Sequence, residues 1–95
     1  MANKSTILII DDEKDIRDSL SEILLDEGYE TCLAADANEA RKLIKQENNV
    51  DIILLDIWMP DCDGITLLKE LKVSQKLKQP IIMMSGHGTI DTAIE

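Results

Sequence analysis

The chain has 95 residues, of which 44% are hydrophobic and 31% charged, and its formal net charge at pH 7 is −9. This balance predicts one small folded domain and excludes a disordered chain. The acidic excess argues against direct contact with nucleic acid, whose phosphates attract lysine and arginine. It fits divalent cations or a basic protein surface, although a solvated acidic surface explains the charge equally well.

The N-terminal residues, the lengths of the apolar runs and the cysteines all bear on the cellular compartment of the protein. No apolar run approaches membrane-spanning length, and the first five residues lack the apolar core of a signal peptide. Cys32 and Cys62 form no Cys-x-x-Cys pair and have no neighbouring histidine to complete a zinc site. We therefore expect a cytoplasmic protein without membrane contact, in which both cysteines pack as ordinary side chains.

The first half of the chain predicts two strand–helix units. Thr6–Ile10 is a β-branched run typical of a buried strand. Apolar residues at helical spacing follow, ending at the candidate helix cap Gly28: Ile16, Leu20, Ile23 and Leu24. Glu30–Ala35 is a weaker strand candidate. Asp36 and Glu39 resemble a capping box, opening a helix whose apolar face is Ala40, Leu43 and Ile44.

The second half repeats the alternation. The apolar run from Ile52 to Leu55 predicts a strand that Asp56 terminates. A loop rich in turn residues leads into a helix with Ile65, Leu68 and Leu71 on its apolar face and Leu67 beside it. Ile81 to Met84 predict a further strand with both methionines in the core, and residues 89–95 predict the first turns of a helix.

Strands that are apolar on both faces, alternating with helices, predict an α/β fold with a parallel sheet covered on two sides. We expect a flavodoxin-like doubly wound sheet with strand order 2-1-3-4, in one domain over residues 1–95.

Polar residues directly follow three of the predicted strands: Asp11 and Asp12, then Asp56, then Ser85. In the order 2-1-3-4 these strands are neighbours, and ligands of such sheets bind beyond the carboxyl ends of the strands. Converging carboxylates repel unless a cation intervenes, and Mg²⁺ suits a few carboxylates together with phosphate oxygens. The pattern therefore predicts a phosphoryl-transfer site with an aspartate nucleophile, whereas each residue taken singly is equally well explained as a turn former or helix cap.

The stretch from Leu54 to Gly64, Leu-Leu-Asp-Ile-Trp-Met-Pro-Asp-Cys-Asp-Gly, together with Asp11-Asp12 and the run from Pro80 to Gly86, resembles response regulator receiver domains. The residues from Met84 to Ile90 are most similar to nitrogen-regulation regulators of the NtrX/NtrC type. The resemblance implies a two-component phosphoacceptor, not an enzyme, that receives a phosphoryl group on Asp56 from a sensor histidine kinase.

The same resemblance implies further roles. Asp12, Asp56 and the backbone carbonyl of Trp58 would hold Mg²⁺ directly, with Asp11 acting directly or through water. Ser85 would be the switch hydroxyl that follows the phosphoryl group and moves the region behind it. An output domain beyond the C-terminal end, in a transcriptional regulator, would carry any DNA contact.

Receiver domains continue through a fifth strand, which begins with a phosphoryl-contacting lysine, and a fifth helix. These 95 residues match only the first four strand–helix units. We therefore expect the strand at Ile81–Met84 to be an open apolar edge and the chain to form a homodimer. A phosphorylation-incompetent interaction fragment is the alternative function.

Two other classes of protein use related sheets. A haloacid-dehalogenase-like phosphatase needs a second aspartate two residues after its nucleophile, where this chain has Trp58. A flavodoxin-type nucleotide domain needs a phosphate loop after the first strand, where Asp11, Asp12 and Glu13 would repel phosphate. The residues disfavour both.

Overall fold

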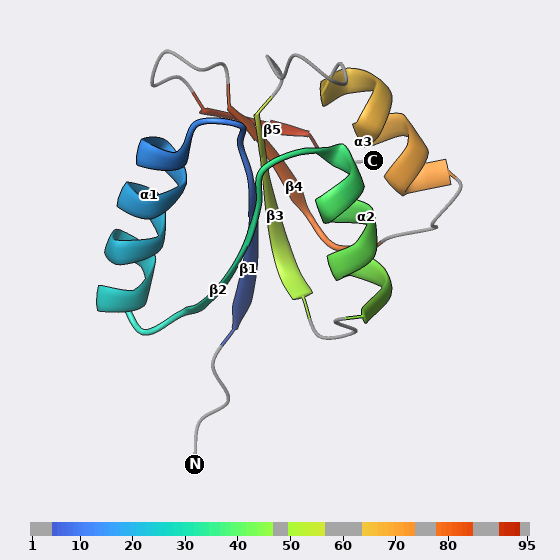
Figure 1. Ribbon diagram of the computed structural model, residues 1–95. Coiled ribbons are helices and arrows are strands. Elements are labelled where there is room, and N and C mark those ends of the chain that lie inside the picture. The colour runs from blue at the N-terminus through green and yellow to red at the C-terminus, as the bar shows by residue number, and fades with distance from the viewer. Residues whose placement is uncertain (1–4, 47–49, 57–63, 74–77, 85–89, 94–95) are drawn as a thin grey trace.

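The computed structural model describes residues 5–46, 50–56, 64–73, 78–84 and 90–93, which form a five-stranded sheet with helices on both faces (Figure 1). The elements are β1 (Thr6–Ile10), α1 (Lys14–Asp26), β2 (Glu30–Ala34), α2 (Ala37–Gln46), β3 (Val50–Asp56), α3 (Gly64–Val73), β4 (Ile81–Met84) and β5 (Ile90–Ala93). The strand order is β2-β1-β3-β4-β5, and the first four strands are parallel. This confirms the predicted parallel α/β sheet of order 2-1-3-4.

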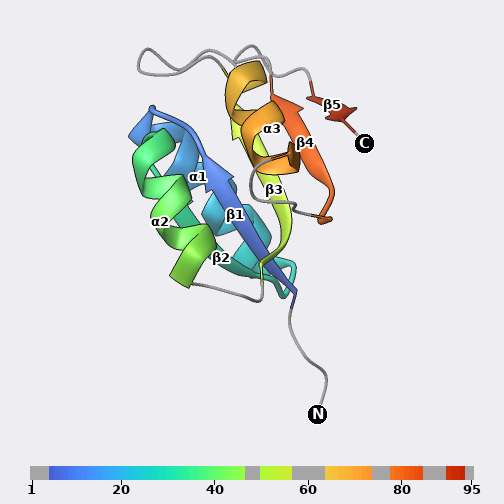
Figure 2. The ribbon, with the colours of Figure 1, turned by 90° about the vertical axis from the view of Figure 1, so that its right-hand side faces the viewer.

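Strand β1 is buried along its whole length and divides its side chains between two hydrophobic clusters. Leu8 and Ile10 pack with α2 and α3, whereas Ile7 and Ile9 face α1. Figure 2 shows α2 and α3 in front of the sheet and α1 behind it. Because successive residues of a strand point to opposite faces, this continuous apolar run fills both cores at once.

The predicted C-terminal end of α1 and the predicted N-terminal start of α2 are confirmed. Gly28 has a φ of 96°, and its N–H donates to Leu25 while the N–H of Tyr29 donates to Leu24, which closes α1 with a Schellman motif. At the start of α2, the carboxylate of Asp36 accepts the N–H of Glu39 at 2.8 Å, and Glu39 in turn accepts the N–H of Ala35 at 2.7 Å. The reciprocal bonds are those of a capping box whose return arm reaches one residue further back.

The apolar faces of α1 and α3 differ from the prediction at one position each. Ile23 is 59% exposed and Ile65 is 46% exposed. In α3 the buried pair is Leu67 and Leu71, which are four residues apart and therefore lie on one helix face. The helical spacing identified the helices, but the angle at which each one meets the sheet selects the buried residues.

Strand β3 begins at Val50, earlier than the predicted start at Ile52, and its pairing with β1 contains a bulge. Thr6 pairs with Val50 and Ile7 with Ile52, so Asp51 is the extra residue. The N–H of Thr6 donates to the carboxylate of Asp51 at 2.8 Å. The Asp51 carboxylate thus provides an acceptor for the backbone N–H of Thr6 at the point where the bulge interrupts the strand pairing.

Residues 90–93 contradict the predicted helix, because they form β5, antiparallel to β4. The expected open edge of β4 is therefore also wrong: Ile81 pairs with Ala93 and Met84 with Ile90. An edge strand exposes a row of backbone donors and acceptors, and pairing satisfies them wherever a neighbouring segment can extend. Of the two methionines predicted in the core, Met84 is buried and Met83 half-buried. Within the described ranges, no helix is long and apolar enough to cross a membrane.

Candidate metal centre

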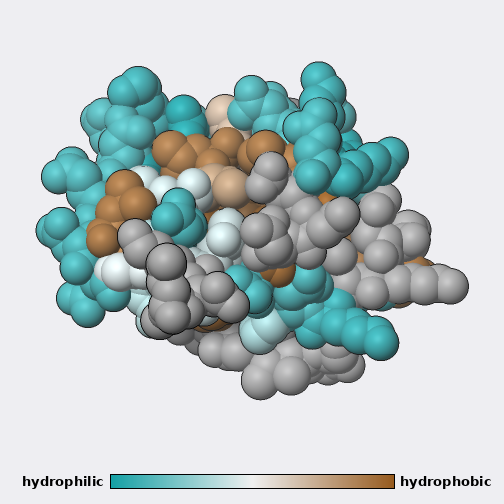
Figure 3. Space-filling model, turned by 90° about the horizontal axis from the view of Figure 1, so that it is seen from below, coloured by the Kyte–Doolittle hydropathy of each residue, from teal (hydrophilic) through white to brown (hydrophobic). Residues whose placement is uncertain are grey.

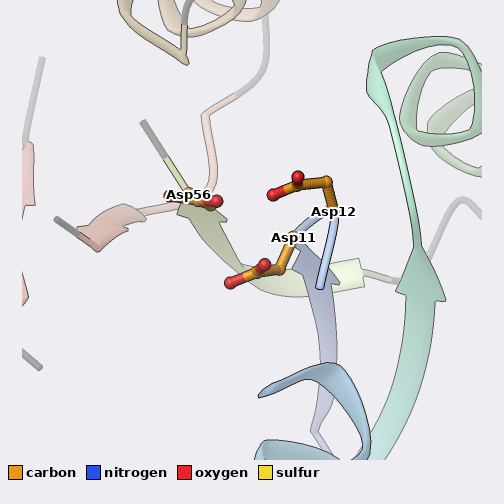
Figure 4. Close-up of side chains that lie close together, drawn as sticks. All are labelled: Asp11, Asp12 and Asp56. Carbon is orange, nitrogen blue, oxygen red and sulfur yellow. The ribbon is translucent and has the colours of Figure 1, made fainter. Parts of the chain in front are cut away.

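Three carboxylates meet at the carboxyl ends of β1 and β3. Asp11 and Asp12 directly follow β1, and Asp56 is the last residue of β3. One oxygen from each lies within 4.8 Å of the other two. Figure 4 shows the side chains of Asp12 and Asp56 pointing toward one another, with the carboxylate of Asp11 beside them. The predicted convergence of these three residues is confirmed.

The strand register explains this meeting. Ile10 of β1 pairs with Leu55 of β3, so the next residue of each strand, Asp11 and Asp56, reaches the same edge of the sheet. On its other side Asp56 pairs with Met84, the last residue of β4. Parallel strands bring their carboxyl ends together, which is why residues far apart in the sequence become neighbours here.

Hydrogen bonds hold Asp11 from several directions. Its N–H donates to the carbonyl of Ala34 at 3.1 Å, which continues the β1–β2 ladder. Its carboxylate accepts the N–H of Glu13 at 2.8 Å, and its carbonyl accepts a bond from Nη1 of Arg17 at 2.7 Å. Asp11 is thus both a turn former and a member of the cluster. The residue that caps α1 is Glu13, without a side-chain cap bond, so neither aspartate is the helix cap.

Burial sets the electrostatics of the cluster. Asp11 is 2% exposed and Asp56 is 4% exposed, whereas Asp12 is exposed. Burial raises the pKa of the Asp11 carboxyl above its ordinary value, and the nearby charges of Asp12 and Glu13 raise it further. The bond from the Glu13 N–H and the charge of Arg17 act in the opposite direction. Burial is the largest cause, so the negative charge at Asp11 is incompletely compensated by the protein.

This arrangement fits a hard divalent cation. The donors are carboxylate oxygens from three residues, two of them buried and one open to solvent. Such oxygens are the preferred ligands of Mg²⁺ and Ca²⁺, and the repulsion among them is relieved when a cation binds. Among the residues that the structure describes, this cluster includes no nitrogen or sulfur ligand of the kind that would favour zinc.

Two of the predicted site residues, Trp58 and Ser85, lie outside the described residues. Their roles remain predictions. Ser85 directly follows Met84, the partner of Asp56 in the β3–β4 ladder.

The sequence reading missed Arg17. Its signal is a cation near the start of a helix, where the helix dipole disfavours positive charge, six residues after Asp11. That signal is weak, because Lys14 shares it and instead forms an exposed pair with Asp18.

The sheet order and the acidic cluster define a flavodoxin-like α/β domain with a candidate cation site at the carboxyl edge of its sheet. The family model of the response regulator receiver domain matches residues 7–95, and the chain belongs to this family. It is the receiver domain of a two-component response regulator, and its sequence is similar to those of NtrX-like regulators.

A putative NtrX-like response regulator of Rickettsia bellii is 42% identical over 90 residues, which are 93% of this chain and 18% of that protein. The solved receiver domain of NtrX from Brucella abortus is 45% identical, with a TM-score of 0.77, and the match covers 86% of this chain and 68% of that one. The receiver domain of a Francisella response regulator is 36% identical, with a TM-score of 0.79, over 90% of this chain and 69% of that one. The chain thus spans about a fifth of the curated relative and about two thirds of the solved receiver domains.

Proposed function

We propose that Asp56 is the phosphoacceptor of this domain and that Mg²⁺ is its cofactor, held by Asp12 and Asp56, with Asp11 contributing directly or through water. The convergence of the three carboxylates within 4.8 Å carries this proposal. Asp56 is the last residue of a central strand. The residue before it, Leu55, pairs with β1, and Asp56 itself pairs with Met84 of β4, which gives its carboxylate a defined direction. The backbone carbonyl of Trp58 completes the proposed ligand set.

The chemistry is a transfer between two nucleophiles. A carboxylate oxygen of Asp56 bonds to phosphorus while the bond from phosphorus to the imidazole nitrogen of a donor histidine breaks, and the electron pair stays on that nitrogen. Mg²⁺, when bound, would neutralise negative charge on the phosphoryl oxygens, which the carboxylates of Asp11 and Asp12 alone would repel. In this proposal Asp12 and Asp56 hold the cation, Asp11 assists directly or through water, and Asp56 is also the residue that reacts. The domain takes the group onto itself and is proposed as a substrate of its partner and not as an enzyme.

The proposed donor is a sensor histidine kinase, and the proposed responder is an output domain of the regulator. The NtrX-like relative is much longer than this chain, which supports a further part that the receiver domain controls. Ser85 is the proposed switch hydroxyl: by donating to a phosphoryl oxygen it would favour one of two packings of the segment that follows β4.

The test is incubation with a small phosphodonor and Mg²⁺, followed by intact mass measurement. We expect the mass of one phosphoryl group on the wild-type chain and none on Asp56→Asn. Asp26→Asn is a matched control, because it removes the same charge from an exposed position at the end of α1. Phosphate on Asp56→Asn would contradict the assignment of the acceptor. A wild-type chain that binds Mg²⁺ but takes no phosphate would favour the phosphorylation-incompetent interaction module.

A further inference from the structure

Arg17 lies one turn into α1 and reaches back to the loop that carries the acidic cluster. Its Nη1 donates to the backbone carbonyl of Asp11 over 2.7 Å, and the side chain is half-buried. Helical side chains lean toward the N-terminus of their helix, so an arginine at this position is directed at the residues before the helix. The contact joins α1 to the turn between β1 and α1.

This position is unfavourable for a cation unless something compensates it. The N-terminal end of a helix carries a partial positive charge, which repels arginine and lysine. Lys14 in the same turn is compensated by Asp18 at 2.7 Å, outside the acidic cluster. Arg17 is compensated by the carbonyl of Asp11 and by the negative charge of the Asp11 side chain, whose pKa it lowers. The structure thus gives Arg17 a specific use at the site.

The bond from Arg17 completes the fixation of Asp11. The backbone N–H of Asp11 is held by Ala34, its carboxylate by the N–H of Glu13, and its carbonyl by Arg17. The first two bonds involve backbone groups, whereas the third comes from a side chain that substitution can remove. Asp12 follows in the chain, so the direction of the Asp11 carbonyl also sets where the Asp12 peptide begins.

We propose that Arg17 is a positioning residue of the metal site, which holds the β1–α1 turn so that Asp11 and Asp12 face Asp56 before the cation binds. This inference rests on the proposed function, because it concerns the same cation. Residues that orient metal ligands without touching the metal typically contribute 10–100-fold to affinity. Arg17 acts on the ligands through the backbone of the turn.

A positioning role and a purely electrostatic role of Arg17 predict opposite changes in Mg²⁺ affinity when the side chain is removed. If Arg17 acted only as a nearby positive charge, its removal would strengthen the binding of Mg²⁺, because less charge would repel the cation. If it positions the turn, its removal weakens binding. The sign of the change in affinity therefore separates the two roles.

The experiment is calorimetric titration of the chain with MgCl₂, for the wild type, Arg17→Ala, Arg17→Lys and Lys14→Ala. We expect Arg17→Ala to weaken Mg²⁺ binding about 10-fold. Arg17→Lys, which keeps a donor for the carbonyl, should bind with an affinity between those of the wild type and Arg17→Ala. Lys14→Ala removes the same charge from the same helix turn and should bind Mg²⁺ at least as tightly as the wild type. Circular dichroism of each metal-free variant checks that the fold is retained.

Equal or tighter Mg²⁺ binding by Arg17→Ala would overturn the inference while leaving the proposed function intact. Equal weakening by Lys14→Ala would also overturn it, because Lys14 bonds to Asp18 and not to the turn, so the loss of affinity would not depend on the bond to the Asp11 carbonyl. Absence of Mg²⁺ binding by the wild type would instead contradict the proposed function. Should Arg17→Ala fail to fold, Arg17→Lys decides: the positioning role requires this variant to bind Mg²⁺ more weakly than the wild type, and wild-type affinity would overturn it.

Discussion

Asp11 shows how one residue serves both the fold and the site. Its carboxylate accepts the N–H of Glu13, as an ordinary turn former would, and yet it lies within 4.8 Å of Asp12 and Asp56. Burial raises its pKa, so ionising this carboxyl in the folded chain costs more free energy than ionising it in the unfolded chain. The buried carboxyl therefore lowers the stability of the metal-free domain, and the proposed cation would relieve this cost.

We expect Asp11→Asn to stabilise the metal-free domain at pH 7, by on the order of 1 kcal/mol. The folded-state pKa lies above the ordinary value of 3.8, so the stability due to the protonated carboxyl is complete below pH 3.8 and is lost as the pH rises through the raised pKa. Urea unfolding with a chelator, at pH 3 and at pH 7, measures the difference. The two proteins should be equally stable at pH 3, and a less stable variant at pH 7 would contradict the account. Saturating Mg²⁺ should remove the advantage of the variant.

Gly28 is required by backbone conformation alone. Its φ is 96°, and a Cβ built on it would meet no atom within 4 Å. We expect Gly28→Ala to lower the free energy of unfolding by about 1–2 kcal/mol, the cost of the left-handed conformation. Gly28→Asn should lose less, because asparagine tolerates this region better. Glu27→Ala is the control, since the φ of Glu27 is −84° and alanine adopts it freely. Equal effects at both positions in urea unfolding would contradict this reading.

At the scale of elements, the three helices of the described residues pack against the sheet in different ways. Helix α1 has no fully buried residue and covers its face of the sheet with the half-buried Leu20 and Leu24. Helices α2 and α3 share the larger cluster and are joined by a bidentate ion pair, in which Nε and Nη2 of Arg41 lie 2.6 and 2.9 Å from the carboxylate of Glu70. The two sides of the sheet are thus covered unequally.

A double-mutant cycle on Arg41→Ala and Glu70→Ala should give a coupling of about 0.5–1 kcal/mol, because both side chains are partly exposed. The hydrogen bond from Arg41 lowers the pKa of Glu70 below 4.5, so the coupling is present above pH 4.5 and is lost as the pH falls through the lowered value. The pair Lys14 and Asp18 is the control: its lysine is 76% exposed, and its coupling should be smaller. Equal coupling for both pairs in thermal unfolding would contradict a special role for the bidentate geometry.

At the scale of the whole molecule, some apolar surface remains exposed to solvent. Figure 3 shows hydrophobic residues between hydrophilic ones on the face seen from below. The exposed large hydrophobic side chains of the described part are Ile23, Leu25, Tyr29, Leu33, Ile65 and Val73. In the cluster facing α1, Ile52 of β3 and Ile82 of β4 are only half-buried. Because β5 pairs with β4, the edge of β4 is not available for self-association, and this half-buried sheet face is apolar surface that self-association would bury.

We predict that the chain forms a homodimer at high concentration by covering the sheet face at Ile52 and Ile82. Light scattering should then give twice the monomer mass, and Ile82→Glu should give the monomer, because a charge cannot be buried there without a partner. Ile65→Glu, on the opposite side of the sheet, is the control and should remain dimeric. A monomeric wild-type chain at high concentration would contradict the prediction, and circular dichroism must show that Ile82→Glu is folded.

Several features could be read from the chain because their causes are local. The run Thr6–Ile10 is apolar at every position but one and has no polar face, so it can only be a strand covered on both sides. Gly28 and the Asp36–Glu39 box act over a few residues, and both ends were predicted correctly. The meeting of Asp11, Asp12 and Asp56 followed from their positions after apolar strands, since parallel strands share one carboxyl edge.

Other features depend on contacts that no local pattern contains. Residues 90–93 carry a helix-like pattern but pair with β4, because the free backbone groups of that strand outweigh a weak local preference. Ile23 and Ile65 stand at helical spacing but point outward, because the sheet meets only part of each helix. The bond from Arg17 to Asp11 joins a helix to the turn before it, and only the direction of the helix axis makes it possible.

The sequence by itself determined the alternation of strands and helices, the helix ends and the three carboxylates, because each depends on side-chain chemistry or on bonds between near neighbours. The tertiary structure decided the fifth strand, the bulge at Asp51 and the bond from Arg17 to the turn between β1 and α1. These depend on unsatisfied backbone groups and on the relative orientation of whole elements, which come into existence only when the sheet has formed.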